Sequence, residues 1–266
     1  MNKQKNLKQE NLKESKPKIE SLKEINLVIN EEETNTLDVE NTHIKALIKQ
    51  DKKINLVIKP KGTIKIDVTL EKNSQATITT LNEEKTTLTF KAECKNNSNL
   101  NIINISTNNI NTENTIRLKE NSSCFLLNNY YTKEGETKIK DLVIHEEQNT
   151  TSKITSKGYL LNSKSNIKGL IQIFPEASNS QGNQESNILL EGKSYAVSIP
   201  DLEIKNNEVK CSHGSTITRI KDEDLFYFES RGITKKEGKH MLIKGHVLSN
   251  VPPEMSHAQN FIGDKI

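Results

Sequence analysis

The chain has 266 residues, 38 basic against 35 acidic side chains and a formal net charge of +3, and only 32% of its residues are hydrophobic. This near balance of charge excludes a polycation built for nucleic acid, and it argues against disorder through self-repulsion. No apolar run approaches the roughly 18 residues of a membrane span, and the charged first residues do not resemble a signal peptide. We therefore expect a cytoplasmic protein with neither membrane nor nucleic acid as a partner.

Two residue types dominate the composition, with 30 Ile and 32 Asn in the chain. Ile is β-branched and favours strands, because its χ1 angle is restricted. Asn favours turns, because it tolerates the left-handed backbone conformation and bonds its own backbone locally. A repeated alternation of the two predicts many short strands separated by tight turns.

The first segment, 1–24, is polar, and Pro17 interrupts any single helix, so we expect a short polar leader. From 25 to 220 the pattern has period two in short bursts, which is the signature of strands. Clear examples are INLVI at 25–29 and at 54–58, and TIKIDVTL at 63–70. Turn residues recur between the bursts, so the segment 25–220 is predicted to be one all-β core.

An all-β core of this length can be a sandwich, a barrel or a β-solenoid. Sandwiches and barrels usually use aromatic core residues, whereas only 4% of this chain is aromatic. A parallel β-helix buries one narrow row of aliphatic side chains per rung and exposes the rest. We therefore favour a parallel β-helix, although the sequence shows no fixed repeat length.

The pattern changes to helices in the segment 221–250. Asp222 can cap a short helix that ends near Gly232, and Thr234 can cap a second one. We expect the aromatic residues 226–228 to pack under the second helix. The remaining residues, 251–266, are predicted to form a mobile tail.

The only suggestive pair of metal ligands is Cys211 with His213. Alternate residues of a strand point the same way, so both side chains share one strand face. Thiolate and imidazole suit zinc or iron–sulfur species, yet two ligands do not close a site. The alternative is a packed cysteine beside a strand histidine. Cys94 and Cys124 match no ligand spacing and are expected to be buried thiols.

The segment around this pair resembles the SufB/SufD family, the β-helical subunits of the SUF iron–sulfur cluster assembly system. The resemblance rests on PDLEI at 200–204, VKCSHGST at 209–216, LFY at 225–227 and SRGI at 230–233. Together with scattered upstream matches, it covers about residues 140–246. Residues 25–140 fit the family only in character.

The resemblance implies a right-handed parallel β-helix with short C-terminal α-helices. It also implies that a second SufB/SufD-type subunit pairs with the end of the β-helix, as a homodimer or a heterodimer. A transient iron–sulfur cluster would form at that interface. His213 matches the family's histidine ligand and Cys211 is its neighbour, while Glu254 is a weaker candidate ligand.

A SufC-like ABC-type ATPase is the second partner that the resemblance implies, and it would dock on the C-terminal helices. Met241, Leu242 and Ile243 are the candidate docking residues, although the same helix could simply cap the end of the β-helix. The chain contains no phosphate-binding loop. The expected function is therefore a non-catalytic scaffold for cluster assembly.

Two other functions stay open from the sequence. The chain could be a purely structural partner of a paralogous scaffold, with no cluster ligands. It could also be a β-helix carbohydrate-active enzyme, which would need acidic and basic residues clustered on an exposed strand face. The scarcity of arginine, with only Arg117, Arg219 and Arg231, disfavours the enzyme.

Overall fold

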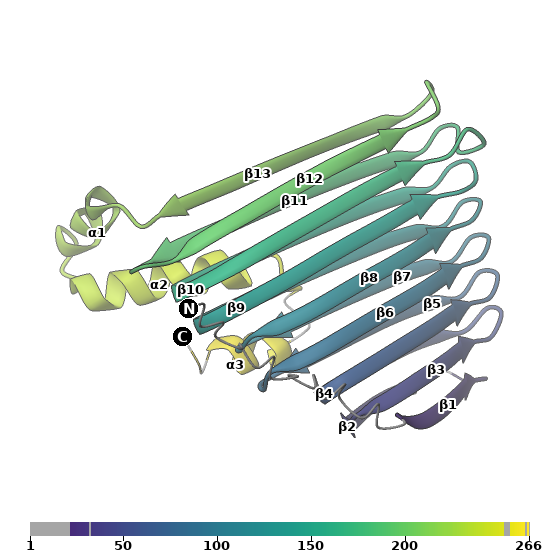
Figure 1. Ribbon diagram of the computed structural model, residues 1–266, viewed down its shortest axis with the longest axis horizontal. Helices are drawn as coiled ribbons and strands as arrows, with labels where there is room; N and C mark the ends of the chain where they lie inside the picture. Colours follow the sequence, from purple (N-terminus) through teal and green to yellow (C-terminus); the bar gives the residue numbers. More distant parts are fainter. Residues whose placement is uncertain (1–21, 32, 253–255, 264, 266) are drawn as a thin grey trace, which may run out of the picture.

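The protein is a stack of parallel strands closed into a solenoid, with helices along one side (Figure 1). The computed structural model describes residues 22–31, 33–252, 256–263 and 265. All the described strands pair in parallel, from β1 at one end of the stack to β13 at the other. The prediction of an all-β parallel β-helix with short C-terminal helices is confirmed. The predicted leader, 1–24, lies almost entirely outside the described residues.

Thirteen strands and three helices make up this part of the chain. Their bounds are β1 Lys23–Ile29, β2 Glu33–Glu40, β3 Thr42–Ile48, β4 Lys53–Leu70, β5 Gln75–Asn82, β6 Thr86–Cys94, β7 Asn99–Ser106, β8 Ile110–Leu118, β9 Ser123–His145, β10 Thr151–Ile173, β11 Gln181–Glu191, β12 Tyr195–Ile204, β13 Lys210–Arg219, α1 Asp222–Glu229, α2 Lys235–Leu248 and α3 Ser256–Gly263. The longest strands bend and take part in two faces, or walls, of the solenoid. In β10, residues 151–161 pair with β11 in one wall, and residues 164–173 pair with β12 in the other.

The asparagines stand at the turns between rungs. Asn73, Asn97 and Asn121 all have positive φ, and each donates from its side chain to the residue one rung below, at 2.8, 3.0 and 3.0 Å. This left-handed conformation suits Asn because its amide compensates the backbone locally. Successive partners are 22, 24 and 24 residues apart, whereas Asn179 and Asn149 are 30 apart. The rungs lengthen along the chain, which explains why the sequence shows no fixed repeat.

The core is the narrow interior of the solenoid. Along β6 every second residue is buried, including Leu88 and Phe90, and the residues between them are exposed or half-buried. Isoleucine, leucine and valine from successive rungs stack inward, so few apolar residues per rung suffice. Cys94 and Cys124 belong to this interior, as predicted.

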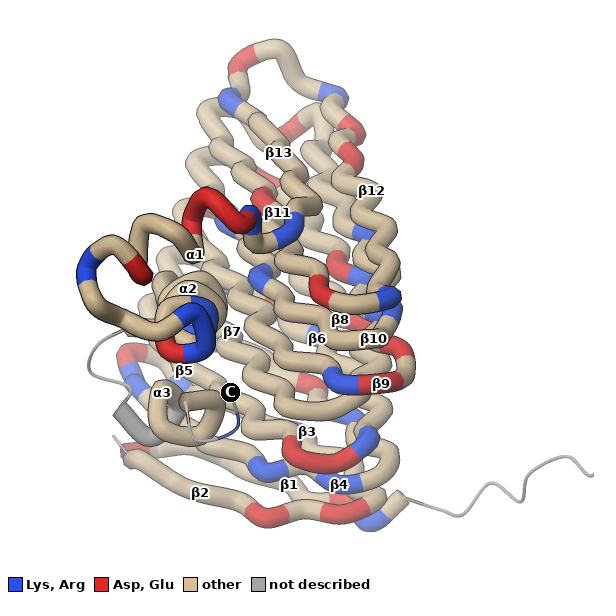
Figure 2. Tube along the Cα trace, turned by 90° about the vertical axis from the view of Figure 1, so that its left-hand side faces the viewer, with Lys and Arg blue, Asp and Glu red and all other residues tan. Residues whose placement is uncertain are grey.

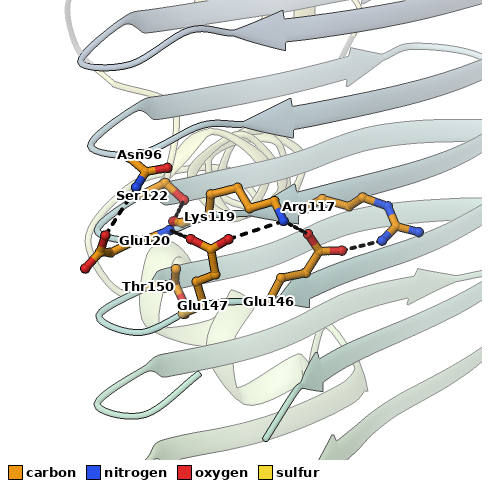
Figure 3. Close-up of polar contacts among 8 residues, drawn as sticks. All are labelled: Asn96, Arg117, Lys119, Glu120, Ser122, Glu146, Glu147 and Thr150. Carbon is orange, nitrogen blue, oxygen red and sulfur yellow. Dashed lines mark hydrogen bonds and ion pairs between the residues drawn. The ribbon is translucent and has the colours of Figure 1, made fainter. Parts of the chain in front are cut away.

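Charged residues form an ion-pair cluster on the turns before and after β9 (Figure 3). Lys119 contacts Glu146 at 2.9 Å and Glu147 at 3.3 Å, and Arg117 also pairs with Glu146. The backbone N–H of Glu120 donates to Glu147 at 3.0 Å. These contacts join two consecutive turns, so the cluster supports the stack from outside, much as the asparagine ladder does.

The C-terminal helices follow the predicted capping pattern. Thr234 is the N-cap of α2: its hydroxyl accepts from the backbone N–H of Glu237, whose carboxylate accepts from the N–H of Thr234 at 3.0 Å. Gly232 has φ +80° after the end of α1, where a glycine is favoured. Asp222 is the first residue of α1 and not its cap, since Lys221 occupies the N-cap position.

Helix α2 lies against the outer face of the sheet (Figure 1). Ile243 and Val247 are buried against a sheet cluster that includes Leu127 and Tyr159. Glu191 at the end of β11 pairs with Lys239 of α2. These contacts fix the helix along its length.

The described part of the predicted tail, 251–266, contains a third helix, and the mobility of the tail stays a prediction. Helix α3 occupies Ser256–Gly263, and Ile262 is fully buried while Phe261 is half-buried. Both belong to the cluster that covers the outer sheet face beside α2. Burial of this apolar pair explains the helix, and the short apolar signal within a polar segment explains why the sequence did not predict it. Within the described ranges, no helix is long and apolar enough to cross a membrane.

Candidate functional site

The interior side chains change character toward the β13 end of the stack. Strand register places them in vertical columns, which we follow from β5 through β7, β9, β10 and β11 to β13. The three columns read Ala76–Leu100–Cys124–Ser152–Gly182–Cys211, Ile78–Ile102–Leu126–Ile154–Gln184–His213 and Thr80–Asn104–Asn128–Ser156–Ser186–Ser215. The first two columns are aliphatic at the bottom and polar at the top. Cys211, His213 and Ser215 therefore form the last inward-facing layer.

The stack is open above this layer. Strand β13 pairs with β11 and β12 pairs with β10, and neither pairs with a further strand among the described residues. Side chains that would be buried in an interior rung are exposed here, such as Ile217 at 42% and Ile204 at 44%. We call this surface, made by β12 and β13, the open end.

Cys211 is half-buried at the open end, with its sulfur above Gly182. A Cβ on Gly182 would lie 3.4 Å from Sγ of Cys211 and 2.9 Å from Ile171 across the interior. The thiol thus rests on a glycine and packs against the aliphatic core. Burial raises the pKa of the Cys211 thiol, and a backbone hydrogen bond at Gly182 offsets this in part. Metal binding would therefore have to displace a thiol proton.

His213 is exposed on the same face of β13, two residues further along the strand. The structure thus brings together the predicted pair Cys211 and His213, as the strand periodicity required. Glu254, the weaker candidate, lies outside the described residues. No group of three or more His, Cys, Asp or Glu side chains suited to a metal ion occurs within the described ranges. The described part of the open end therefore brings together two candidate metal ligands, and further ligands would have to come from elsewhere.

The sequence assigned no role to the residues beneath this pair, although Gln184 is one of the upstream positions that fit the family pattern. Gln184 and Gly182 lie one rung below His213 and Cys211 and form the floor of the site. One feature of the sequence distinguishes them. Gly182 and Gln184 occupy buried positions of β11, whereas aliphatic residues occupy most equivalent positions in the lower rungs. Which wall they touch depends on the register, which a single sequence without a fixed repeat does not give.

The candidate docking residues of α2 divide between two faces. Met241 is exposed, Leu242 is half-buried, and Ile243 is buried against the sheet. The expectation that residues 226–228 pack under α2 was wrong for two of the three: Phe226 is 69% exposed and Tyr227 56% exposed. The reason is the pitch of the short helix α1, which turns only Phe228 toward Gly238 of α2.

Three large apolar side chains on these helices are exposed. They are Phe226 and Tyr227 on α1 and Met241 on α2, and we call them together the helix patch. Met241 also lines a surface pocket with Gly232, Ile233 and His240. The guanidinium of Arg231 lies 5.0 Å from the ring of Tyr227. Figure 2 shows the acidic first turn of α1 in red, where the chain leaves β13.

The fold and this site define a class of protein: a parallel β-helix with a Cys-x-His strand at its open end and helices along its side. Residues 29–246 match the profile of the family described as SUF system FeS cluster assembly, SufBD core domain. The match covers most of the chain. The chain therefore belongs to the SufBD family.

Curated relatives agree with the family. The chain is 34% identical over 139 residues to the iron–sulfur cluster assembly SufBD family protein ycf24 of Porphyra purpurea, which covers 50% of this chain and 28% of the relative. It is 45% identical over 78 residues to the iron–sulfur cluster assembly protein SufD of Escherichia coli K12, covering 29% of this chain and 18% of the relative. It is 29% identical over 118 residues to a SufBD family protein of Staphylococcus aureus, covering 42% and 25%. The matched stretches thus span less than a third of these relatives.

Proposed function

We propose that the chain is a non-catalytic scaffold subunit for iron–sulfur cluster assembly, acting in the cytoplasm. The observation that carries the proposal is the pair Cys211 and His213 on one face of β13, at the open end of a SufBD-family β-helix. A thiolate and an imidazole are both accepted ligands of iron–sulfur species. The cluster is the cargo of this protein, and the rest of its ligands would come from a partner subunit.

Pairing through the open end would complete the site. The edge of β13 has unpaired backbone groups, and Ile204 and Ile217 are exposed apolar side chains. Binding of another chain would pair the backbone groups and bury the side chains, so both features favour an interface here. In a two-fold symmetric pair, each copy presents Cys211 and His213 across the axis. Two thiols and two imidazoles then surround one cluster. A paralogous SufB/SufD-type subunit on the same surface would do so with its own ligands.

The helix patch is the proposed docking surface for a SufC-like ABC-type ATPase. Its support is the exposure of Phe226, Tyr227 and Met241, three large apolar side chains on two adjoining helices. Ile243 is excluded from direct docking because its side chain packs on the sheet. Leu242 lies at the boundary of the two faces.

A purely structural partner without cluster ligands is the second candidate function. The packing of Cys211 on Gly182 and the aliphatic interior favours it, because a thiol that packs on the core has a structural role without a metal. In that case the open end would pair with a paralogous scaffold, but Cys211 and His213 would be dispensable.

Anaerobic reconstitution separates the two functions. The full chain, co-expressed with a SufC-type ATPase, is treated with iron and sulfide as wild type, Cys211→Ser and His213→Ala. His43→Ala is the matched control, since His43 lies on β3 and bonds Asp67 at 2.7 Å, far along the stack from the open end. We expect cluster absorbance in wild type and control and its loss in both site variants. Unchanged absorbance in both site variants would overturn the scaffold proposal.

A further inference from the structure

One buried side chain below the open end has an unused hydrogen-bonding atom. Gln184 on β11 is only 4% exposed, and its Oε1 is buried with no hydrogen-bond partner among the described residues. Buried side-chain oxygens are nearly always paired, because an unmade hydrogen bond costs about 1–3 kcal/mol. An unpaired amide oxygen in this place therefore points to a hydrogen-bond donor that is not within bonding distance of it in this structure.

The amide group of Gln184 reaches across the interior to the opposite wall. A Cβ on Gly169 of β10 would lie 1.7 Å from its Nε2 and 2.8 Å from its Oε1. Gly169 is thus a glycine because the amide occupies the space where a side chain would stand. Gly169 pairs with Pro200 in β12, and Gln184 pairs with His213 in β13. The amide therefore lies on the floor of the space between these two top strands.

The strand register places the imidazole of His213 in the layer above this floor. It belongs to the residue one rung above Gln184 in the same inward-facing column, and it is exposed among the described residues. A histidine that binds a metal through one ring nitrogen almost always donates the N–H of the other to a nearby oxygen, which fixes its tautomer and orientation. Oε1 of Gln184 is an oxygen of this kind.

We propose that Gln184 is the positioning residue of His213. Its Oε1 accepts a hydrogen bond from one ring N–H, so that the other nitrogen is left free to bind iron. This inference rests on the proposed function, because it assigns His213 the role of a ligand. Gln184 itself does not touch the cluster, and Gly169 is needed only to leave room for the amide.

A simple filling role for Gln184 makes a different prediction. If the side chain only packs the floor, methionine of similar length will serve equally well. Ser186 also has a buried, unpartnered hydroxyl, but it faces Ser215 and not His213. Ser186→Ala is therefore the matched control for removal of one unpaired oxygen from the same strand.

The first test is anaerobic binding of Co²⁺ to the full chain, followed by the thiolate-to-cobalt absorption band. Gln184→Met is expected to weaken binding by about 10-fold to 100-fold, the usual effect of losing the partner of a ligating histidine. Gln184→Glu, which keeps an acceptor oxygen, is expected to bind at least as tightly as wild type. Gly169→Ala, which displaces the amide, should weaken binding, whereas Ser186→Ala and the unhindered Gly245→Ala should not.

The second test reads the tautomer of His213 without relying on metal affinity. Ring ¹⁵N shifts are recorded at pH 8 on the metal-free and Zn²⁺-loaded chain, with the His213 signals identified by their loss in His213→Ala. Wild type should differ from the tautomer ratio of free histidine, and Gln184→Met should move toward it. The signals of His145, whose ring is bonded at 2.7 and 2.8 Å to Thr150 and Ser152, should stay in place and report an intact fold.

The outcomes separate the two claims. If wild type binds Co²⁺ no better than His213→Ala, the proposed role of His213 as a ligand fails. If His213 matters but Gln184→Met matches wild type in both affinity and tautomer ratio, the positioning role of Gln184 fails. An affinity loss in Gln184→Met that Gln184→Glu does not restore, with an unchanged tautomer, assigns Gln184 a packing role and also overturns the inference.

Discussion

Replacement of one turn asparagine tests how the stack is held together. Asn97 has φ +59°, and its side chain lies in the middle of the ladder: it donates to Asn73 and accepts from Asn121, both at 3.0 Å. Asn97→Ala removes both hydrogen bonds and leaves an ordinary L-residue in the left-handed region. Asn97→Gly removes the same hydrogen bonds but tolerates the backbone.

The two variants divide the stabilisation into its parts. Each exposed ladder bond contributes about 0.5–1 kcal/mol, at the low end of the range for hydrogen bonds. The left-handed backbone costs a residue such as alanine about 1–2 kcal/mol. Asn97→Ala should therefore lose about 2–4 kcal/mol of unfolding free energy, and Asn97→Gly about 1–2 kcal/mol.

Urea denaturation followed by circular dichroism measures both losses. Asn96→Ala is the control, because Asn96 is the neighbouring turn residue with a single side-chain bond, at 3.2 Å to Glu120, and no positive φ. It should lose at most about 1 kcal/mol. Two results would refute this reasoning: Asn97→Ala is as stable as Asn97→Gly, or it loses only as much stability as Asn96→Ala. Either would mean that the asparagine ladder does not stabilise the stack.

Two further predictions concern the interior and the helix patch. Burial lowers the pKa of His145 from 6.5 to about 4. The free energy of unfolding should therefore be highest above pH 6.5 and should fall by about 3 kcal/mol as the pH drops toward 4, because the unfolded chain takes up the proton first. His145→Gln should remove this part of the pH dependence in urea titrations at several pH values; an unchanged slope between pH 4 and 7 would contradict it. Met241→Asp should abolish co-purification with a SufC-type ATPase, whereas Val28→Asp, an equally exposed apolar residue on β1, should not; retention by both, or loss by both, would remove the helix patch as the docking surface.

Local features of the sequence predicted most of the fold. Period-two bursts such as TIKIDVTL coincide with strand β4, and Thr234 caps α2 as its spacing to Glu237 implied. Asparagine predicted the turns correctly because its preference for them is local and does not depend on tertiary contacts. The pair Cys211 and His213 followed from strand alternation alone.

Features set by contacts across the interior were not predictable in the same way. The growth of the rungs from 22 to 30 residues hides the register, so the neighbours of Gln184 and Gly169 could not be read from spacing. The direction of Phe226 depends on where the short helix α1 starts relative to α2. Helix α3 forms because Ile262 is buried on the outer sheet face, which only the folded stack provides.

The coordination of the cluster itself tests most directly whether His213 is a ligand at the open end. Pulsed electron paramagnetic resonance on the reduced, reconstituted complex, with ¹⁵N-histidine in this chain, detects nitrogen bound to iron. We predict a strongly coupled histidine nitrogen in wild type that disappears in His213→Ala and persists in His43→Ala. A cluster without histidine coupling, or a coupling that survives in His213→Ala, would contradict the placement of the cluster at the open end.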